Sequence, residues 1–272
     1  MKMSKFFFQL VKEIKYDEVG FVANQLTYKL LLSFFPCLIF IMTLIGFFEL
    51  KIDLTKFHYL PEDILNVILN FDKEVIQTRN AGILSTSLLV AIFSASSGFN
   101  AVIKGINKAY GIKETRSFIV VRLISIGLVI LFALSIVMSL VLWIFSGNIL
   151  RFIQKYIVLD TYLINLFSYV GTLGTLGLIL LVVMFIYKVA CCRKISFRST
   201  LPGALVTVAI WVLSSKIFQM YVNNFSRYSK VYGSIAGVFV LMFWLNIISF
   251  VLLLGSEINA LLDDNEDGTK EL

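Results

Sequence analysis

Long apolar runs separated by short charged segments dominate the pattern along this chain. Six charge-free stretches stand out, at 30–48, 81–103, 123–150, 161–187, 199–215 and 231–256. A helix needs about 20 apolar residues to cross the hydrocarbon core of a bilayer. None of the stretches alternates polar and apolar residues with period two, as barrel strands do. The pattern therefore predicts an all-α membrane protein, with six transmembrane helices in a compact bundle.

The composition excludes the common soluble classes. Of the 272 residues, 58% are hydrophobic and 15% are charged. A soluble domain is about 45–50% apolar and about 25% charged. Three cysteines, with only one histidine, give neither a disulfide framework nor a zinc spacing. We therefore expect no metal and no cofactor, and the lipid bilayer is the first predicted partner.

The basic residues predict how the helices are oriented. They concentrate in the segment before the first span and in the second and fourth loops, as Lys2, Lys5, Lys12, Lys15, Lys29, Lys104, Lys108, Lys113, Arg116, Arg122, Lys188, Arg193, Lys194 and Arg198. Basic loops stay in the cytoplasm. The net charge of +7 is then an orientation signal, with both termini cytoplasmic. Because the basic residues are dispersed among loops, we expect no nucleic-acid partner.

Two segments outside the spans are amphipathic. In the N-terminal segment, residues 1–22, the apolar positions have helical spacing: Phe6, Phe7, Leu10, Val11 and Ile14. That spacing predicts a helix lying in the cytoplasmic membrane interface. In the first loop, Pro61 precedes an apolar stripe made of Ile64, Val67, Ile68, Phe71 and Val75. That second helix either packs over the outer ends of the spans or binds a partner. Residues 23–262 form the transmembrane domain, and 263–272 form an acidic tail.

Small residues and one proline predict how the spans pack. Helices in lipid approach closely at small residues, and we expect such packing at Gly171, Gly174, Gly177, Gly233 and Gly237. Pro36 should kink the first span. The kink is either structural or part of a pathway through the bundle.

Ionisable groups inside spans are expensive and mark candidate sites. Lys216 and Glu257 are the two candidates, near opposite membrane faces. We expect Lys216 to reach the outer interface along its stem. We expect Glu257 to pair with a basic residue at the cytoplasmic ends, namely Lys29, Lys104 or Arg122. Asn246, near the middle of the last span, could form a hydrogen bond to another helix.

Four sequence blocks resemble the YihY/BrkB family of bacterial membrane proteins. They read ANQLTY and LLSFFP at 23–36, SASS and INKAYG at 94–111, PG at 202–203, and YGSIAG and LGSEINA at 232–260. The blocks follow the family's order from about residue 20 to 262. They add four polar residues to the candidate sites: Tyr28, Asn107, Tyr232 and Asn259. Lys29 departs from the family pattern, which usually has an aromatic or small residue there.

The resemblance implies a six-span bundle in a bacterial plasma membrane without settling the activity. The family includes proteins of the UPF0761 type and was once labelled ribonuclease BN, and one branch is named for virulence. Three functions stay open: a transporter or translocase for a lipid or another amphiphile, a scaffold for the cell envelope, and a ribonuclease. The last has little support, because the only histidine is His58 in the first loop. A polar cavity lined by Tyr28, Pro36, Asn246 and Glu257 would favour transport, and a filled core would favour a scaffold. The oligomeric state is left open.

Overall fold

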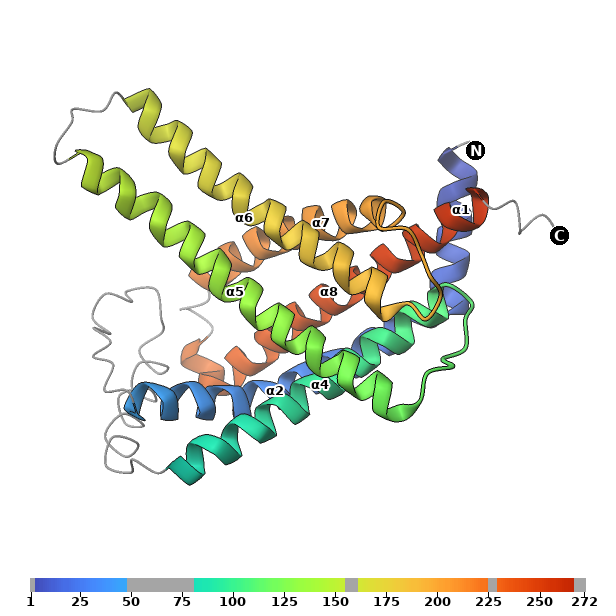
Figure 1. The fold of residues 1–272 in the computed structure, drawn as a ribbon, viewed down its shortest axis with the longest axis horizontal. Coiled ribbons are helices and arrows are strands. Elements are labelled where there is room, and N and C mark those ends of the chain that lie inside the picture. The colour runs from blue at the N-terminus through green and yellow to red at the C-terminus, as the bar shows by residue number, and fades with distance from the viewer. Residues whose placement is uncertain (1–2, 48–80, 155–160, 225–228, 267–272) are drawn as a thin grey trace.

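The computed structural model describes residues 3–47, 81–154, 161–224 and 229–266, and every element within them is a helix (Figure 1). The helices are α1 Met3–Tyr16, α2 Val19–Phe47, α4 Ala81–Ala109, α5 Phe118–Gln154, α6 Thr161–Ala190, α7 Leu201–Asn224 and α8 Ser229–Glu266. The expected first-loop helix at 61–75 lies outside the described residues, as do the side chains of Tyr232 and Gly233.

Within the residues that the structure describes, five helices are long and apolar enough to cross a membrane. The candidate spans are Ser85–Ala109, Phe118–Ser139, Gly171–Ala190, Leu201–Tyr221 and Gly237–Asp263. They confirm the helical membrane class and match the last five predicted stretches. The first predicted stretch overlaps α2 over residues 30–47, and α2 is not among the five candidates. The sixth span and the orientation of the termini therefore stay predictions.

The two described prolines occupy the positions that the sequence predicts. Pro202 lies in the first turn of α7, where a missing backbone N–H costs little. Pro36 lies inside α2, which continues past it to Phe47. Figure 1 shows α2 changing direction along its length, as the loss of a backbone hydrogen bond at proline allows.

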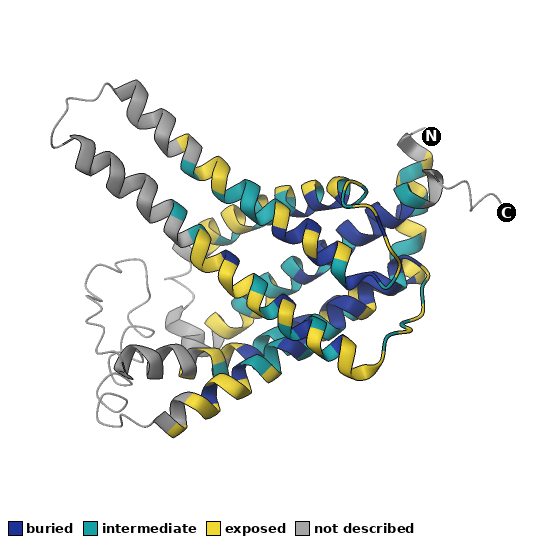
Figure 2. Cartoon of the chain, in the orientation of Figure 1, coloured by how far each residue is buried: buried dark blue, intermediate teal, exposed yellow. Residues whose placement is uncertain are grey.

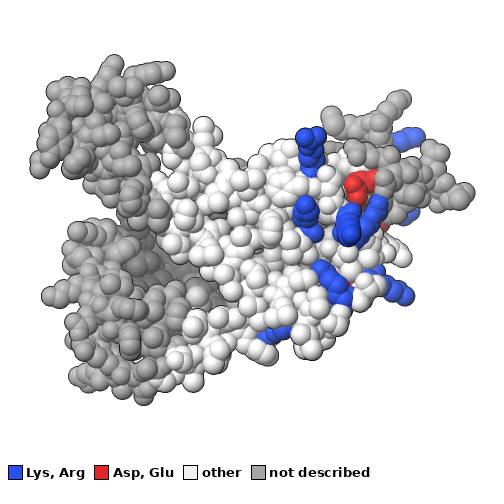
Figure 3. Space-filling model, viewed as in Figure 1, with Lys and Arg blue, Asp and Glu red and all other residues white. Residues whose placement is uncertain are grey.

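The packed core lies at one end of the bundle. The buried side chains belong mainly to the amino ends of α2, α5 and α7 and to the carboxyl ends of α4, α6 and α8. Figure 2 shows these buried segments together on one side, with exposed positions increasing toward the other. On the face drawn in Figure 3, the described Lys and Arg side chains gather at the same end. We call it the charged end.

Away from the charged end, α5 and α6 diverge from α2 and α4 (Figure 1). Among the described residues, the helices therefore pack closely at the charged end and less closely beyond it. Apolar side chains such as Leu173, Phe239 and Phe243 are exposed there. In lipid, burying such side chains gives no hydrophobic gain. The helices must therefore be held together by polar contacts and close backbone approach, and both occur at the charged end.

Candidate functional site

The carboxyl end of α4 is closed by a glycine turn. Gly111 has φ of +65°, and its N–H donates to the Lys108 carbonyl at 2.9 Å. The next N–H, of Ile112, donates to the Asn107 carbonyl at 2.8 Å. This bond pattern is a Schellman motif, which requires a left-handed residue and so favours glycine. The turn directs residues 112–117 back across the charged end.

Asn107 joins this turn to the chain that follows α6. Its side chain is buried, with Nδ2 donating to Glu114 Oε2 at 2.8 Å. Its Oδ1 accepts the backbone N–H of Cys192 at 2.7 Å. A single buried amide therefore satisfies both a carboxylate and a backbone donor, which is typical of a structural polar group.

Glu114 and Arg116 complete a cluster that we call the loop clamp: Asn107, Glu114 and Arg116. Arg116 binds the carboxylate with two nitrogens, Nε to Oε1 at 2.8 Å and Nη2 to Oε2 at 2.7 Å. The same guanidinium donates to the carbonyls of Val189 at 3.1 Å and Ala190 at 2.7 Å. These carbonyls end α6, where a cation is favoured by the helix dipole.

The loop clamp makes stability depend on pH. The Arg116 hydrogen bonds lower the pKa of Glu114 from 4.5 to about 2. A depressed folded-state pKa contributes stability above pH 4.5, and this is lost as the pH falls from 4.5 toward 2. We expect the unfolding free energy in detergent to fall over that range, and to fall less steeply in Glu114→Gln. Identical slopes for the two chains would show that Glu114 does not carry this dependence.

Helices α7 and α8 touch backbone to backbone at the charged end. A Cβ added to Gly203 would collide with the carbonyl oxygen of Gly255 and with the side chain of Asn259. A Cβ added to Gly255 would collide with Thr207 and with the Tyr187 hydroxyl. Such close approach is the common way for helices to associate in lipid. We call these five residues the α7–α8 seam.

Hydroxyl and indole groups strengthen the seam. The fully buried Tyr187 hydroxyl donates to the Leu252 carbonyl at 2.8 Å and lies 2.7 Å from Thr207 Oγ1. Further along, Trp211 Nε1 donates to the Ile248 carbonyl at 3.0 Å. The accepting carbonyls share one face of α8, since they are four residues apart. Three helices are thereby joined through one row of carbonyls.

Asn259 caps α7 from a neighbouring helix. Its Oδ1 accepts the Gly203 N–H at 2.7 Å, and its Nδ2 donates to the Thr200 carbonyl at 3.2 Å. The first N–H groups of a helix have no partner within the helix. Both polar atoms of this buried amide are therefore used in closing the end of α7.

We expect Asn259→Leu to lower the unfolding free energy by about 2 kcal/mol, because it leaves the Gly203 N–H buried without a partner. The measurement is denaturation followed by helicity in mixed micelles. Asn24→Leu serves as a control on a more exposed amide. An equal loss in the two variants would contradict the capping role.

The other predicted polar residues do not form one site. Asn246 forms a hydrogen bond to another helix, as the sequence suggests: its Nδ2 donates to Asn24 Oδ1 of α2 at 2.7 Å. The side chain of Tyr28 is 57% exposed, whereas Glu257 is 2% exposed. A polar cavity lined by Tyr28, Pro36, Asn246 and Glu257, which would favour transport, is not one of the two cavities described below.

The charged candidates are also separate from one another. Arg122 donates to the Phe93 carbonyl at 3.1 Å, and its guanidinium carbon lies 4.1 Å from the centre of the Phe93 ring. Lys29 lies close enough to Lys104 for their charges to repel. Lys216 is exposed on α7, far along the helix from the seam that neighbours Glu257. The pairing of Glu257 with Lys29, Lys104 or Arg122 stays a prediction.

The glycines that pack closely differ from those expected. No described atom outside the helix backbone lies within 4 Å of a Cβ built at Gly174, Gly177 or Gly237. The close approaches are at Gly203 and Gly255, and at Gly105 beside Leu253. Close helix packing at Gly174, Gly177 and Gly237 is therefore not found within the described residues. Glycine spacing alone does not decide where helices touch, because a second helix segment must also lie opposite the glycine.

A groove opens between α7 and α8 beyond the seam, away from the charged end. Its volume is about 400 Å³, and its lining is Ser214, Ile217, Phe218, Tyr221, Phe239, Val240, Phe243, Trp244 and Ile247. Phe218 stacks on Trp244 with ring centres 5.3 Å apart. Among the described residues, Trp244 Nε1 has no hydrogen-bond partner. The groove therefore combines apolar walls with two hydroxyl-bearing residues, Ser214 and Tyr221.

Metal-binding side chains do not gather in the part of the chain that the structure describes. No group of three His, Cys, Asp or Glu residues there could hold a metal ion. His58, the only histidine, lies outside the described residues. The described clusters are thus built from amides, hydroxyls and one Glu–Arg pair.

Comparisons with known proteins agree with a membrane helical bundle. A family model described as "Virulence factor BrkB" matches residues 10–272. The chain is 36% identical over 242 residues to the "Putative ribonuclease-like protein YfkH" of Bacillus subtilis, covering 88% of each chain. It is 26% identical over 274 residues to a "UPF0761 membrane protein" of Tolumonas auensis, covering 97% of this chain and 86% of that one. No solved structure matches significantly.

Proposed function

This chain belongs to the virulence factor BrkB family of membrane proteins, and from that premise we propose that it binds an amphiphile, such as a phospholipid, and passes it between the leaflets. The single observation that carries the proposal is the apolar groove between α7 and α8. A volume of about 400 Å³ falls in the range of ligand pockets, about 300–1,000 Å³. Its walls suit an acyl chain, and Ser214 and Tyr221 supply the hydroxyl groups of its lining.

The proposal includes a placement in the membrane. It assumes six spans in a bacterial plasma membrane, and the positive-inside rule then puts the charged end in the cytoplasm. The groove then lies in the outer half of the bilayer, and the loop clamp and the seam close the inner half. An amphiphile could enter the groove sideways from the lipid, with no need for a water-filled pore.

A substitution that fills the groove tests whether an amphiphile binds there. Ser214→Phe adds a ring to the lining, and Ser215→Phe adds the same ring to the neighbouring, exposed position of α7. The measurement is photo-crosslinking of a diazirine-bearing phospholipid to the full chain in vesicles, mapped by mass spectrometry. We expect crosslinks on α7 and α8 that Ser214→Phe reduces severalfold and Ser215→Phe does not. Crosslinks spread evenly over all helices would contradict the proposal.

Two other functions remain as alternative proposals. A scaffold without a transported substrate is favoured by the closed, hydrogen-bonded charged end. A ribonuclease is suggested only by the printed name of the Bacillus subtilis relative. RNA cleavage by the purified chain, abolished by replacing Glu257 or the acidic tail, would establish the latter.

A further inference from the structure

Helix α1 lies across the charged end and presents three different faces. One face is buried: Leu10, flanked by Phe6 and Ile14, packs against Ile258 and Leu261 of α8. The packing holds α1 on the bundle, and a turn at residues 17–18 joins it directly to α2. The other two faces of α1 are exposed.

The second face is apolar, yet it does not pack on the bundle. Phe7 is 63% exposed, Phe8 is 77% exposed, and Val11 is also exposed. Because α1 is attached to membrane-spanning helices at the end where they meet the interface, these side chains lie where headgroups and acyl chains meet. Exposed aromatic side chains at such a position are typical of helices that lie in the membrane surface.

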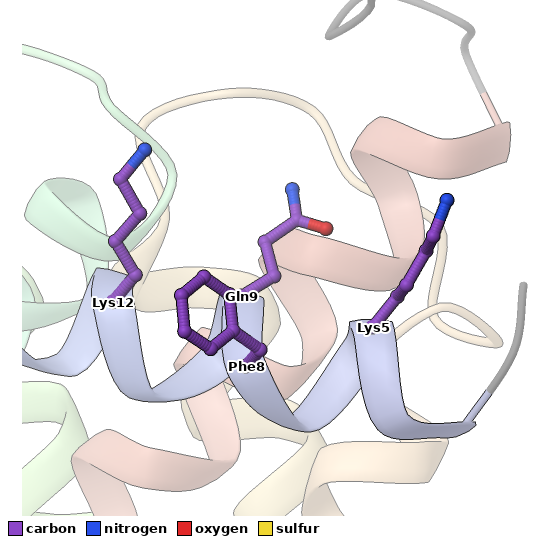
Figure 4. Close-up of a pocket in the computed structure, with 4 residues that line it drawn as sticks. All are labelled: Lys5, Phe8, Gln9 and Lys12. Atoms are coloured by element: carbon purple, nitrogen blue, oxygen red, sulfur yellow. The ribbon is translucent and has the colours of Figure 1, made fainter.

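The third face is cationic and lines a shallow pocket. Lys5, Phe8, Gln9 and Lys12 surround a space of about 480 Å³ on the surface of α1. Figure 4 shows Lys5, Gln9 and Lys12 projecting to the same side of the helix, with Phe8 beside them. No ion pair is found between either lysine and a described acidic side chain. Two ammonium groups and one amide donor are therefore available to an anion.

The geometry points to α1 as a binding site for an anionic phospholipid in the leaflet at the charged end. The lysines and Gln9 bind the headgroup phosphate, and Phe7, Phe8 and Val11 enter the boundary between headgroups and acyl chains. Each lysine near an anionic surface contributes about fivefold to binding. The inference rests on α1 alone, so it does not depend on a translocation activity.

A lysine variant with a matched control tests this inference. Lys5→Gln with Lys12→Gln removes two charges from α1. Lys113→Gln with Lys194→Gln removes two charges from exposed loop positions at the same end. All four lysines are exposed, so each chain should fold, which circular dichroism in detergent would verify.

Native mass spectrometry of the full chain, titrated with phosphatidylglycerol or phosphatidylcholine, measures the preference. We expect the unaltered chain and the loop variant to bind phosphatidylglycerol more tightly than phosphatidylcholine, and the α1 variant to lose about 25-fold of that preference. Equal binding of the two lipids by the unaltered chain would overturn the inference. So would an undiminished preference in the α1 variant, or the same loss in the loop variant.

Discussion

Gly255→Ala is expected to lower the free energy of unfolding by about 3 kcal/mol, through overpacking and lost hydrogen bonds. The added methyl group would overlap the Tyr187 hydroxyl and Thr207, and would press on the Gly203 backbone. Helices α7 and α8 would have to separate, which breaks the bonds that join them to α6. Denaturation in mixed micelles, followed by helicity, measures the loss.

Gly237→Ala is the matched control for this prediction, since it lies on the same helix with no described atom near its Cβ position. Alanine favours a helix over glycine by about 1 kcal/mol, so this variant should be as stable as the original chain or more so. If both substitutions destabilise the chain equally, the seam is not what holds α7 against α8.

Arg116→Ala is the second large expected effect, a loss of about 3 kcal/mol, because a half-buried carboxylate and two helix-end carbonyls lose their donor. Arg116→Lys should recover less than half of the loss, since an ammonium cannot bind the carboxylate through two nitrogens while also reaching Val189 and Ala190. The same micelle denaturation measures both variants.

Lys113→Ala is the control for the loop clamp, because Lys113 is exposed in the same loop. A surface substitution of this kind changes stability by about 0.5 kcal/mol or less. Full recovery in Arg116→Lys would show that only the charge matters, and would contradict the geometry of the clamp.

The spans could be predicted because charge is so sparse within them. Lys216 and Glu257 were predicted as charged exceptions within the spans, and the structure places Lys216 on the surface of α7 and Glu257 in the core. The amphipathic N-terminal helix is confirmed as α1, Met3–Tyr16. Its apolar positions predict one interfacial face, whereas in the structure Leu10 packs on α8 and Phe7 and Val11 are exposed. A hydrophobic pattern predicts a helix face without predicting which neighbour covers each part of it.

The contacts at the charged end could not be predicted in the same way. Glu114 and Arg116 are two residues apart, so their pairing is a local signal that could have been found. Their second role, capping α6, depends on a segment more than 70 residues away. Gly203 and Gly255 belong to recognisable blocks, but only the crossing of α7 and α8 shows that a side chain cannot fit. Thr207 and Tyr187 of the seam could have been predicted as contact residues, because hydroxyl groups within apolar spans form hydrogen bonds to other helices.

Transfer of a fluorescent phospholipid across the membrane of sealed vesicles tests the central claim most directly. The full chain is reconstituted into phosphatidylcholine vesicles, and dithionite, which cannot enter, bleaches only probes that reach the outer leaflet. We predict that the unaltered chain and Ser215→Phe expose the inner-leaflet probe, and that Ser214→Phe slows its exposure severalfold. Bleaching by the unaltered chain that stops at the level of protein-free vesicles would contradict translocation and leave the scaffold as the function that the structure supports.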